Sequence, residues 1–260
     1  MQKFHYVIAT TAQQIRDAQR LRWTVYADEE GLLGGPTPID SRETDARDYC
    51  EGTTHLLVYD GQEAAGTVRL LEPRGSLGLD LAAKFDLGAL SAPGIAPAEV
   101  TRYCVLRRYR CTGVTSALFS GLYAESSRRG VTHWVAGANT GTDCVEDATL
   151  AHRLACAQGL MSERYSSTVR DLEPAQTPRR RPGYTDEQRL RAQGGDLTGL
   201  ELPRTLSLFA KRMGGRYVGS PAYDAYFNVF ALPLVATLAE IAARRSPAAR
   251  PARAVAEGLA

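Results

Sequence analysis

The chain has 260 residues, of which 44% are hydrophobic, and a formal net charge of +2 at pH 7. This balance argues against general nucleic-acid binding, and no apolar run reaches the roughly 18 residues of a transmembrane helix. The five cysteines are scattered and form no CxxC pair, which fits reduced thiols and a cytoplasmic protein.

The domain organisation follows from length and local composition. At this length, a single domain with an elaboration is favoured over two domains, and we assign it to residues 1–243. Residues 175–199 are rich in Arg, Gly and Pro and poor in apolar side chains, which predicts a mobile insertion. Residues 244–260 are expected to be a disordered tail.

The first third of the chain predicts a strand, a helix, a polar loop and a hairpin. The strand is expected over 3–9, and an amphipathic helix capped at Thr10 and Thr11 is expected to run to about Leu32. The hairpin lies in 54–73 and turns at Asp60-Gly61. Gly66, inside its second strand, predicts a bulge or a close approach of a ligand.

The remaining elements alternate between strand and helix patterns. They are a short helix in 78–90, a strand over 98–107, a helix from Val114, a strand over 132–139, a helix over 142–159, a strand within 160–174, a helix over 201–215, a strand pair from 216 to 235 and a last helix up to 245.

The stretch from Glu99 to Thr115 organises the chain. It reads as a buried strand, a glycine turn and the start of a helix. Free N–H groups at a helix N-terminus favour an anion, so Arg110, Gly113, Val114 and Thr115 predict a phosphate site. The alternative is a plain connection between two elements.

Arg110 to Thr115 resemble the Q/R-x-x-G-x-G/A pattern of the GNAT superfamily, whose members move an acyl group from a pantetheine thioester to an amine. Thr115 departs from the usual Gly or Ala. The resemblance implies an α/β fold in which helices flank a mixed, splayed β-sheet. It also implies that the thioester enters where the central strands part, with its phosphate at 113–115.

A second pattern in the N-terminal half is similar to the acyl-homoserine-lactone synthases, a branch of that superfamily. An Arg and an aromatic residue in the first helix precede an E-x-D-x-x-D stretch, an Arg in the third strand and E-x-S-R in the fourth. The matching residues are Arg22, Tyr26, Glu43, Asp45, Asp48, Arg69, Glu99, Thr101 and Arg102. Thr101 replaces Ser and keeps a hydroxyl, whereas Leu32 stands where the lactone synthases carry Trp.

The C-terminal segment favours another branch. Residues 202–228 resemble the LP…G…V-x-G-x-PA-x-D-x-x-FN segment of ornithine-lipid N-acyltransferases and long-chain N-acyl amino acid synthases. This resemblance implies an N-acyltransferase that joins a long-chain acyl group, carried by acyl carrier protein or coenzyme A, to the α-amino group of an amino acid. The alternatives are a lactone synthase using S-adenosylmethionine, an ornithine-lipid enzyme, or a non-catalytic acyl-carrier-binding module.

Amide formation from a thioester needs a base and a polarised carbonyl. Glu99 is the candidate base, although it could instead pair with Arg102. Backbone N–H groups near Val105 and Leu106 are candidates for polarising the carbonyl, and Arg69 and Arg102 for binding an acceptor carboxylate.

The resemblance assigns acceptor binding to Arg22, Tyr26, Asp45, Asp48 and Arg69. We expect Asp45 and Asp48 to order the acidic loop around Arg22 and Arg69 rather than bind metal. No bound cofactor is needed, because the thioester is already activated. The basic residues near 179–191 predict docking of acyl carrier protein or a peripheral contact with the inner membrane face.

Overall fold

The computed structural model describes residues 4–33, 38–74, 77–170 and 181–245. The strands are β1 Tyr6–Ile8, β2 Thr53–Asp60, β3 Glu63–Leu71, β4 Pro97–Val105, β5 His133–Asn139, β6 Arg216–Tyr217, β7 Ala222–Asp224 and β8 Val229–Thr237. The α-helices are α1 Ala12–Trp23, α2 Val114–Arg128, α3 Val145–Ala157, α4 Asp186–Gln193, α5 Arg204–Leu208 and α6 Leu238–Arg245.

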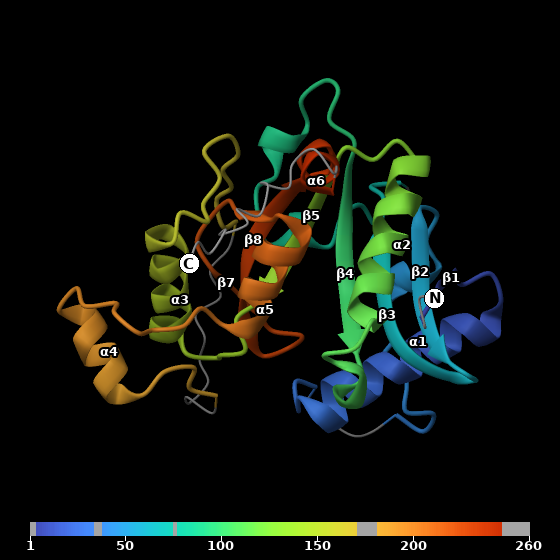
Figure 1. The fold of residues 1–260 in the computed structure, drawn as a ribbon, viewed down its shortest axis with the longest axis horizontal. Coiled ribbons are helices and arrows are strands. Elements are labelled where there is room, and N and C mark those ends of the chain that lie inside the picture. The colour runs from blue at the N-terminus through green and yellow to red at the C-terminus, as the bar shows by residue number, and fades with distance from the viewer. Residues whose placement is uncertain (1–3, 34–37, 75–76, 171–180, 246–260) are drawn as a thin grey trace, which may run out of the picture.

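The eight strands form one mixed sheet. Its order is β1-β2-β3-β4-β5-β8-β6, and β7 also pairs with β8. Among the strands that the structure describes, β4 and β5 are the one parallel pair; they are registered over Pro97–Glu99 and His133–Val135, whereas β4 continues to Val105 and β5 to Asn139. The two strands therefore separate beyond Glu99, and the sheet opens between them (Figure 1). This open sheet flanked by helices confirms the predicted GNAT fold.

Helices α1 and α2 cover opposite faces of the N-terminal half-sheet. Val68 and Leu70 of β3 share a core with Leu118 of α2. The alternate residue Arg69 points to the other face, toward α1, since successive side chains of a strand alternate. Figure 1 shows α2 crossing in front of β2–β4. One side of the half-sheet is therefore an apolar core, and the other carries the predicted polar residues.

Helix α2 approaches strand β3 most closely at Gly66. A Cβ atom there would lie 2.6 Å from Val114 Cγ1 and 3.0 Å from Leu118 Cδ1. Gly66 also pairs with Val58, beside an irregularity in the register between β2 and β3. The bulge expected at this glycine is confirmed, while the close approach is made by a helix and not by a ligand.

We expect Gly66→Ala to lower the free energy of unfolding by about 1–3 kcal/mol, because an added methyl group overpacks this contact. The measurement is urea unfolding followed by circular dichroism. Gly183→Ala is the matched control, since a Cβ at Gly183 meets its nearest atom at 3.6 Å. Equal stability of the two variants would contradict the interpretation.

Several element boundaries differ from the sequence-based prediction. The first helix changes after Trp23 into a π-helical turn, Thr24–Glu29. The strand expected within 160–174 is wrong for its described part, which forms two isolated bridges, Met161 with Tyr217 and Phe85 with Val169. Strand β8 runs to Thr237, because it pairs with β5 along the whole of that strand.

The segment predicted as an insertion contains helix α4. Thr185 caps this helix with a capping box, and Figure 1 shows it beside α3. Leu150 and Leu154 of α3 form an apolar cluster with Tyr184, Ala192 and Leu200, which lie in and around α4. Residues 171–180 lie outside the described part, and the mobility of 175–199 stays a prediction.

The predicted tail overlaps the last helix. Helix α6 extends to Arg245, two residues into the segment 244–260, and the rest of that segment lies outside the described residues. Within the ranges that the structure describes, no helix combines the length and the apolar character that crossing a membrane requires.

Candidate active site

A bulge in β4 brings two successive side chains to one face of the sheet. Thr101 pairs with Arg69 of β3, the register then shifts, and Arg102 adopts a φ of 53°. This left-handed conformation costs a non-glycine residue about 1–2 kcal/mol. As a result, Arg102 joins Glu99 and Thr101 on the face toward α1, where strict alternation would have turned it away.

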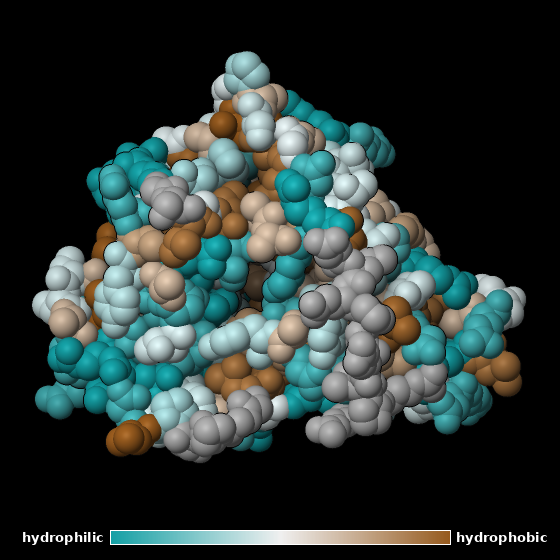
Figure 2. Space-filling view, turned by 180° about the vertical axis from the view of Figure 1, so that it is seen from behind, coloured by the Kyte–Doolittle hydropathy of each residue, from teal (hydrophilic) through white to brown (hydrophobic). Residues whose placement is uncertain are grey.

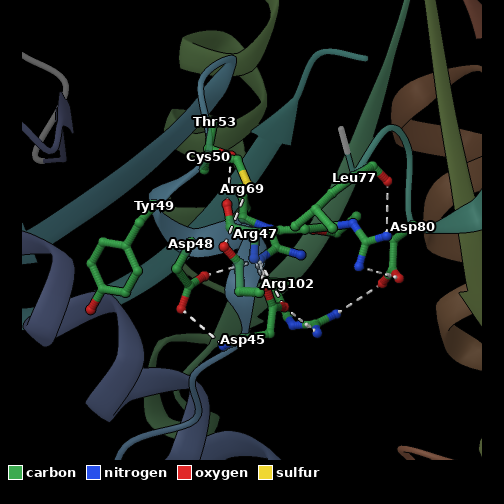
Figure 3. A network of polar contacts seen from close by, with 12 residues as sticks. Asp45, Arg47, Asp48, Tyr49, Cys50, Thr53, Arg69, Leu77, Asp80 and Arg102 are labelled. Carbon is green, nitrogen blue, oxygen red and sulfur yellow. Dashed lines mark hydrogen bonds and ion pairs between the residues drawn. The ribbon is translucent and has the colours of Figure 1, made fainter. Parts of the chain in front are cut away.

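The face toward α1 holds a buried network of ion pairs. Arg22 donates two hydrogen bonds to Asp48, at 2.8 and 2.6 Å, and its Nε lies 2.6 Å from Glu43 Oε2. Arg69 Nη1 donates to Asp45 and Asp48 at 2.8 and 2.9 Å (Figure 3). Five side chains from three segments thus interlock, which confirms that Asp45 and Asp48 order their loop around the two arginines.

Arg102 closes the network on the side of the β7–β8 loop. Its Nε donates to Glu43 at 3.0 Å and its Nη2 to Asp45 at 2.6 Å. Its guanidinium carbon lies 5.4 and 5.3 Å from the ring centroids of Tyr226 and Phe227. The Tyr226 hydroxyl also donates to Glu43 at 2.9 Å, so this loop is fastened to the acidic stretch.

Three side chains of this network are buried, and they are therefore not available to a ligand in the cavity. Arg22, Asp48 and Arg69 are each at most 2% exposed. Burial alone would raise the pKa of Asp48, but the Arg22 and Arg69 guanidinium groups and the Gln19 amide outweigh it, so this pKa lies well below its usual range. These three side chains are held inside the protein and do not line the cavity described next.

The cavity has a volume of about 650 Å³ and lies where β4 and β5 separate. Residues of β4, β5, α2, α5 and β8 line it, together with the π-helical turn after α1. Seen from behind, the surface is hollowed near its middle and hydrophilic side chains surround the hollow (Figure 2). Its lining combines apolar walls with two groups of charged residues.

Glu99 faces this cavity and is 3% exposed. Its Oε2 accepts a hydrogen bond of 3.1 Å from the backbone N–H of Leu81. Burial raises the pKa of Glu99 to about 7, and the Asp80 carboxylate adds to the effect. Because Arg102 is paired elsewhere, the alternative of a Glu99–Arg102 pair is not what the structure shows. A carboxyl group that titrates near neutrality suits a general base.

We define the acceptor end of the cavity as the charged residues around Glu99, which are Asp80, Lys84, Glu99, Arg102 and Asp224. Lys84 Nζ lies 2.6 Å from Asp224 Oδ2. Tyr26 and Phe227 also line the cavity, and their rings are 4.8 Å apart. Of the residues assigned to acceptor binding, Tyr26 lines the cavity. Asp45 does not line it, and is hydrogen-bonded to Arg102, which does.

We define the donor end as the part around the N-terminus of α2. Arg110, Thr112, Thr115 and Ser116 line it, and Gly113 is the N-cap residue of α2 without a side-chain cap. Arg110 is held by Glu29 and Glu30, each at 2.7 Å. Val114 is fully buried, and its N–H donates to Thr112 Oγ1 at 3.4 Å. Three further arginines line the cavity, namely Arg181, Arg204 and Arg212.

The two backbone candidates for polarising the thioester carbonyl are not equivalent. Leu106 N–H donates to Ala65 O at 3.1 Å, so it belongs to the β3–β4 ladder and is not available. In an antiparallel pair, hydrogen-bonded positions alternate, so the N–H of the adjacent Val105 points away from β3, toward the gap before β5. Val105 therefore keeps the predicted geometry, and Leu106 does not.

The sequence reasoning missed several residues of the site. Lys84 and Asp80 lie in a segment without a recognised motif, and Arg204 and Arg212 were not singled out. Asp224 and Phe227 lie within the D-x-x-FN segment, which was used only to choose a branch.

Cys104 is buried, and burial raises the pKa of its thiol to about 12, which opposes a nucleophilic role.

Comparisons with known proteins agree on the fold. Residues 21–120 match the family described as acetyltransferase (GNAT) domain. The structure is similar to that of FeeM, an N-acyl amino acid synthase from uncultured soil microbes, with a TM-score of 0.54 and 11% identity over 96% of this chain and 98% of that chain.

Two further solved structures are similar over most of their length. BjaI, a CoA-dependent acyl-homoserine lactone synthase, has a TM-score of 0.46 and 15% identity over 91% of this chain and 83% of that chain. An aminoglycoside 6'-N-acetyltransferase complexed with coenzyme A has a TM-score of 0.46 and 12% identity over 89% and 97%. A search of curated protein sequences finds no significant match.

Proposed function

We propose that this chain, which contains a GNAT acetyltransferase domain over residues 21–120, is an N-acyltransferase for amino acids. It would move a long-chain acyl group from an acyl-phosphopantetheine thioester to an α-amino group. The observation that carries the proposal is Glu99, a buried carboxyl with a pKa of about 7, facing a cavity that also contains the N-terminus of α2.

The proposed chemistry is direct attack of the amine on the thioester. An α-amino group is largely protonated at neutral pH and must lose a proton before it attacks. Glu99 takes this proton, directly or through one water molecule. The N–H of Val105 donates a hydrogen bond to the carbonyl oxygen as negative charge develops on it. The C–S bond then breaks, and the leaving thiolate takes the proton that the attacking nitrogen releases as it becomes the amide.

The donor end suits an anionic carrier arm. Glu29 and Glu30 already pair with Arg110, so a phosphate there is favoured mainly by the partial positive charge of the N–H groups at the start of α2. The exposed Arg204 and Arg212 extend this positive charge to a second depression outside the cavity. Both acyl carrier protein and coenzyme A carry the same phosphopantetheine arm, and both have further negative charge near it.

The deciding experiment is the mass of the products formed from purified protein, a long-chain acyl thioester, free amino acids including ornithine, and S-adenosylmethionine. Acyl carrier protein and coenzyme A thioesters are tested separately. An acylated amino acid supports the proposal and identifies the acceptor. An acyl-homoserine lactone would replace it with the lactone synthase alternative, and donor binding without product would favour a binding module.

Reversing two charges at the donor end tests how the thioester is recognised. We expect Arg204→Glu together with Arg212→Glu to raise the KM for the thioester at least about tenfold, with a weaker salt dependence than in the wild type. Arg20→Glu, a charge reversal on the exposed surface of α1, is the matched control. An unchanged KM in the double variant would show that these arginines do not contact the donor.

A further inference from the structure

The acceptor end contains two cations, Lys84 and Arg102, and only one of them has hydrogen-bonding capacity to spare. The Arg102 guanidinium is paired with Glu43 and Asp45, and Asp80 lies 3.9 Å from its third nitrogen. Arg69 is fully buried behind it. The two arginines expected to hold an acceptor carboxylate are therefore already committed to the protein's own carboxylates.

Lys84 is placed by the same turn that positions Glu99. Leu81 donates its N–H to Glu99, and the N–H of Lys84 donates to Leu81 O at 3.1 Å, so Lys84 lies one 3₁₀ turn further along. Three residues of such a turn rise about 6 Å, a distance that a lysine side chain can bridge. The ammonium group and the proposed base therefore reach the same end of the cavity from one short segment.

The Lys84 ammonium group is held in place by an ion pair that does not use all of its hydrogen-bond donors. Among the residues that the structure describes, its one ion pair is with Asp224, which lies at the end of β7, and the lysine side chain is 33% exposed. An ammonium group has three N–H donors, so two remain for a ligand. Asp224 also neutralises the cation and fixes the direction in which it points.

We infer that Lys84 is the residue that binds the α-carboxylate of the amino acid acceptor, with Asp224 positioning its ammonium group. This inference rests on the proposed function and deepens it, because it makes a free carboxylate next to the reacting amine a requirement for good acceptors. With the carboxylate on Lys84, the α-amino group is directed toward Glu99. Amines without a carboxylate lack this second anchor.

The test compares amino acids with their methyl esters in wild type, Lys84→Met and Lys84→Arg, using thiol release from the acyl thioester as the rate. We expect Lys84→Met to lower kcat/KM for the free amino acid about 10- to 100-fold, mainly through KM, since a charge-assisted contact is lost. For the methyl ester the rate should stay within about twofold, and Lys84→Arg should recover part of the loss.

Three outcomes would overturn the inference. A loss of equal size for the acid and the ester in Lys84→Met would indicate a structural role. An unchanged rate with the acid would place the carboxylate elsewhere. Wild-type protein that acylates the ester as readily as the acid would refute the carboxylate requirement while leaving the N-acyltransferase function intact.

A binding measurement separates this inference from the proposed function. The melting temperature of wild type and Lys84→Met is recorded with each amino acid and with its methyl ester. A rise with the free acid that is present in wild type and absent in Lys84→Met supports the site even if no acyl transfer is detected. If no free amino acid raises the melting temperature of the wild type, the site is refuted.

Discussion

We expect that replacing Glu99 by Gln lowers kcat for the proposed amide formation by about 100- to 10,000-fold, because the variant keeps the size of the side chain and loses the proton acceptor. The wild-type kcat rises with pH and levels off above about 7, since only the carboxylate form of Glu99 accepts a proton. In Glu99→Gln this rise is absent. A variant that kept the wild-type profile would identify another group as the base.

Asp80→Asn is the companion variant for the pH profile. The Asp80 carboxylate contributes to the raised pKa of Glu99, although burial is the larger cause. Removing this negative charge should therefore move the rise in kcat to lower pH and leave its shape unchanged. A rise that stayed near pH 7 would mean that burial alone sets the pKa.

The raised pKa of Glu99 also affects stability. Activity is expected to rise with pH, whereas the stability that Glu99 contributes falls with pH. The pKa of Glu99 rises from an ordinary 4.5 to about 7 on folding, so the native state binds more protons than the unfolded state between these values. The contribution of Glu99 to wild-type stability therefore falls as pH rises from 4.5 to 7. Over this range the stability of Glu99→Gln relative to wild type should improve by up to about 3 kcal/mol. An inactive variant that gains stability cannot be explained by misfolding.

Replacing Asp48 by Asn lowers the free energy of unfolding by about 3–5 kcal/mol, because it leaves two buried guanidinium groups without their shared carboxylate. Arg22 and Arg69 both depend on Asp48 and neither reaches solvent. The measurement is urea unfolding at neutral pH. Since the pKa of Asp48 lies below its ordinary 3.8, its stabilising contribution is complete above that value and declines as pH falls below it.

The matched control for Asp48→Asn removes a charge from an exposed ion pair. Arg20 lies 3.8 Å from Asp17 on the surface of α1, with half of its side chain exposed. Arg20→Gln should leave the unfolding midpoint where it is in the wild type. If Asp48→Asn behaved like Arg20→Gln, the network would be adding order to the site without stabilising the fold.

Local patterns in the sequence were sufficient for most of the elements and for the choice of Glu99 as the candidate base. The Asp60-Gly61 turn, the strand around Glu99 and the helix from Val114 depend on residues close to one another in the chain. The polar residues of the acidic stretch were also recognised, together with the arginines around which they fold. Helix α4 was missed because much of its apolar packing comes from Leu150 and Leu154 of α3, which lie far from it in the sequence. Its capping box, Thr185 and Gln188, is a local signal that was overlooked.

What the sequence determined by itself was the set of chemical groups: a carboxyl on the central strand, arginines near it, and a turn and helix start suited to phosphate. The tertiary structure decided which of these groups are free to act. The positive φ of Arg102 and the pairing of Arg69 commit both arginines to Glu43, Asp45 and Asp48. Lys84 and Asp224 meet only because β7 folds back onto β8 beside the turn that follows Asp80. Ion pairing and burial depend on distances across the fold, and a linear pattern does not contain those distances.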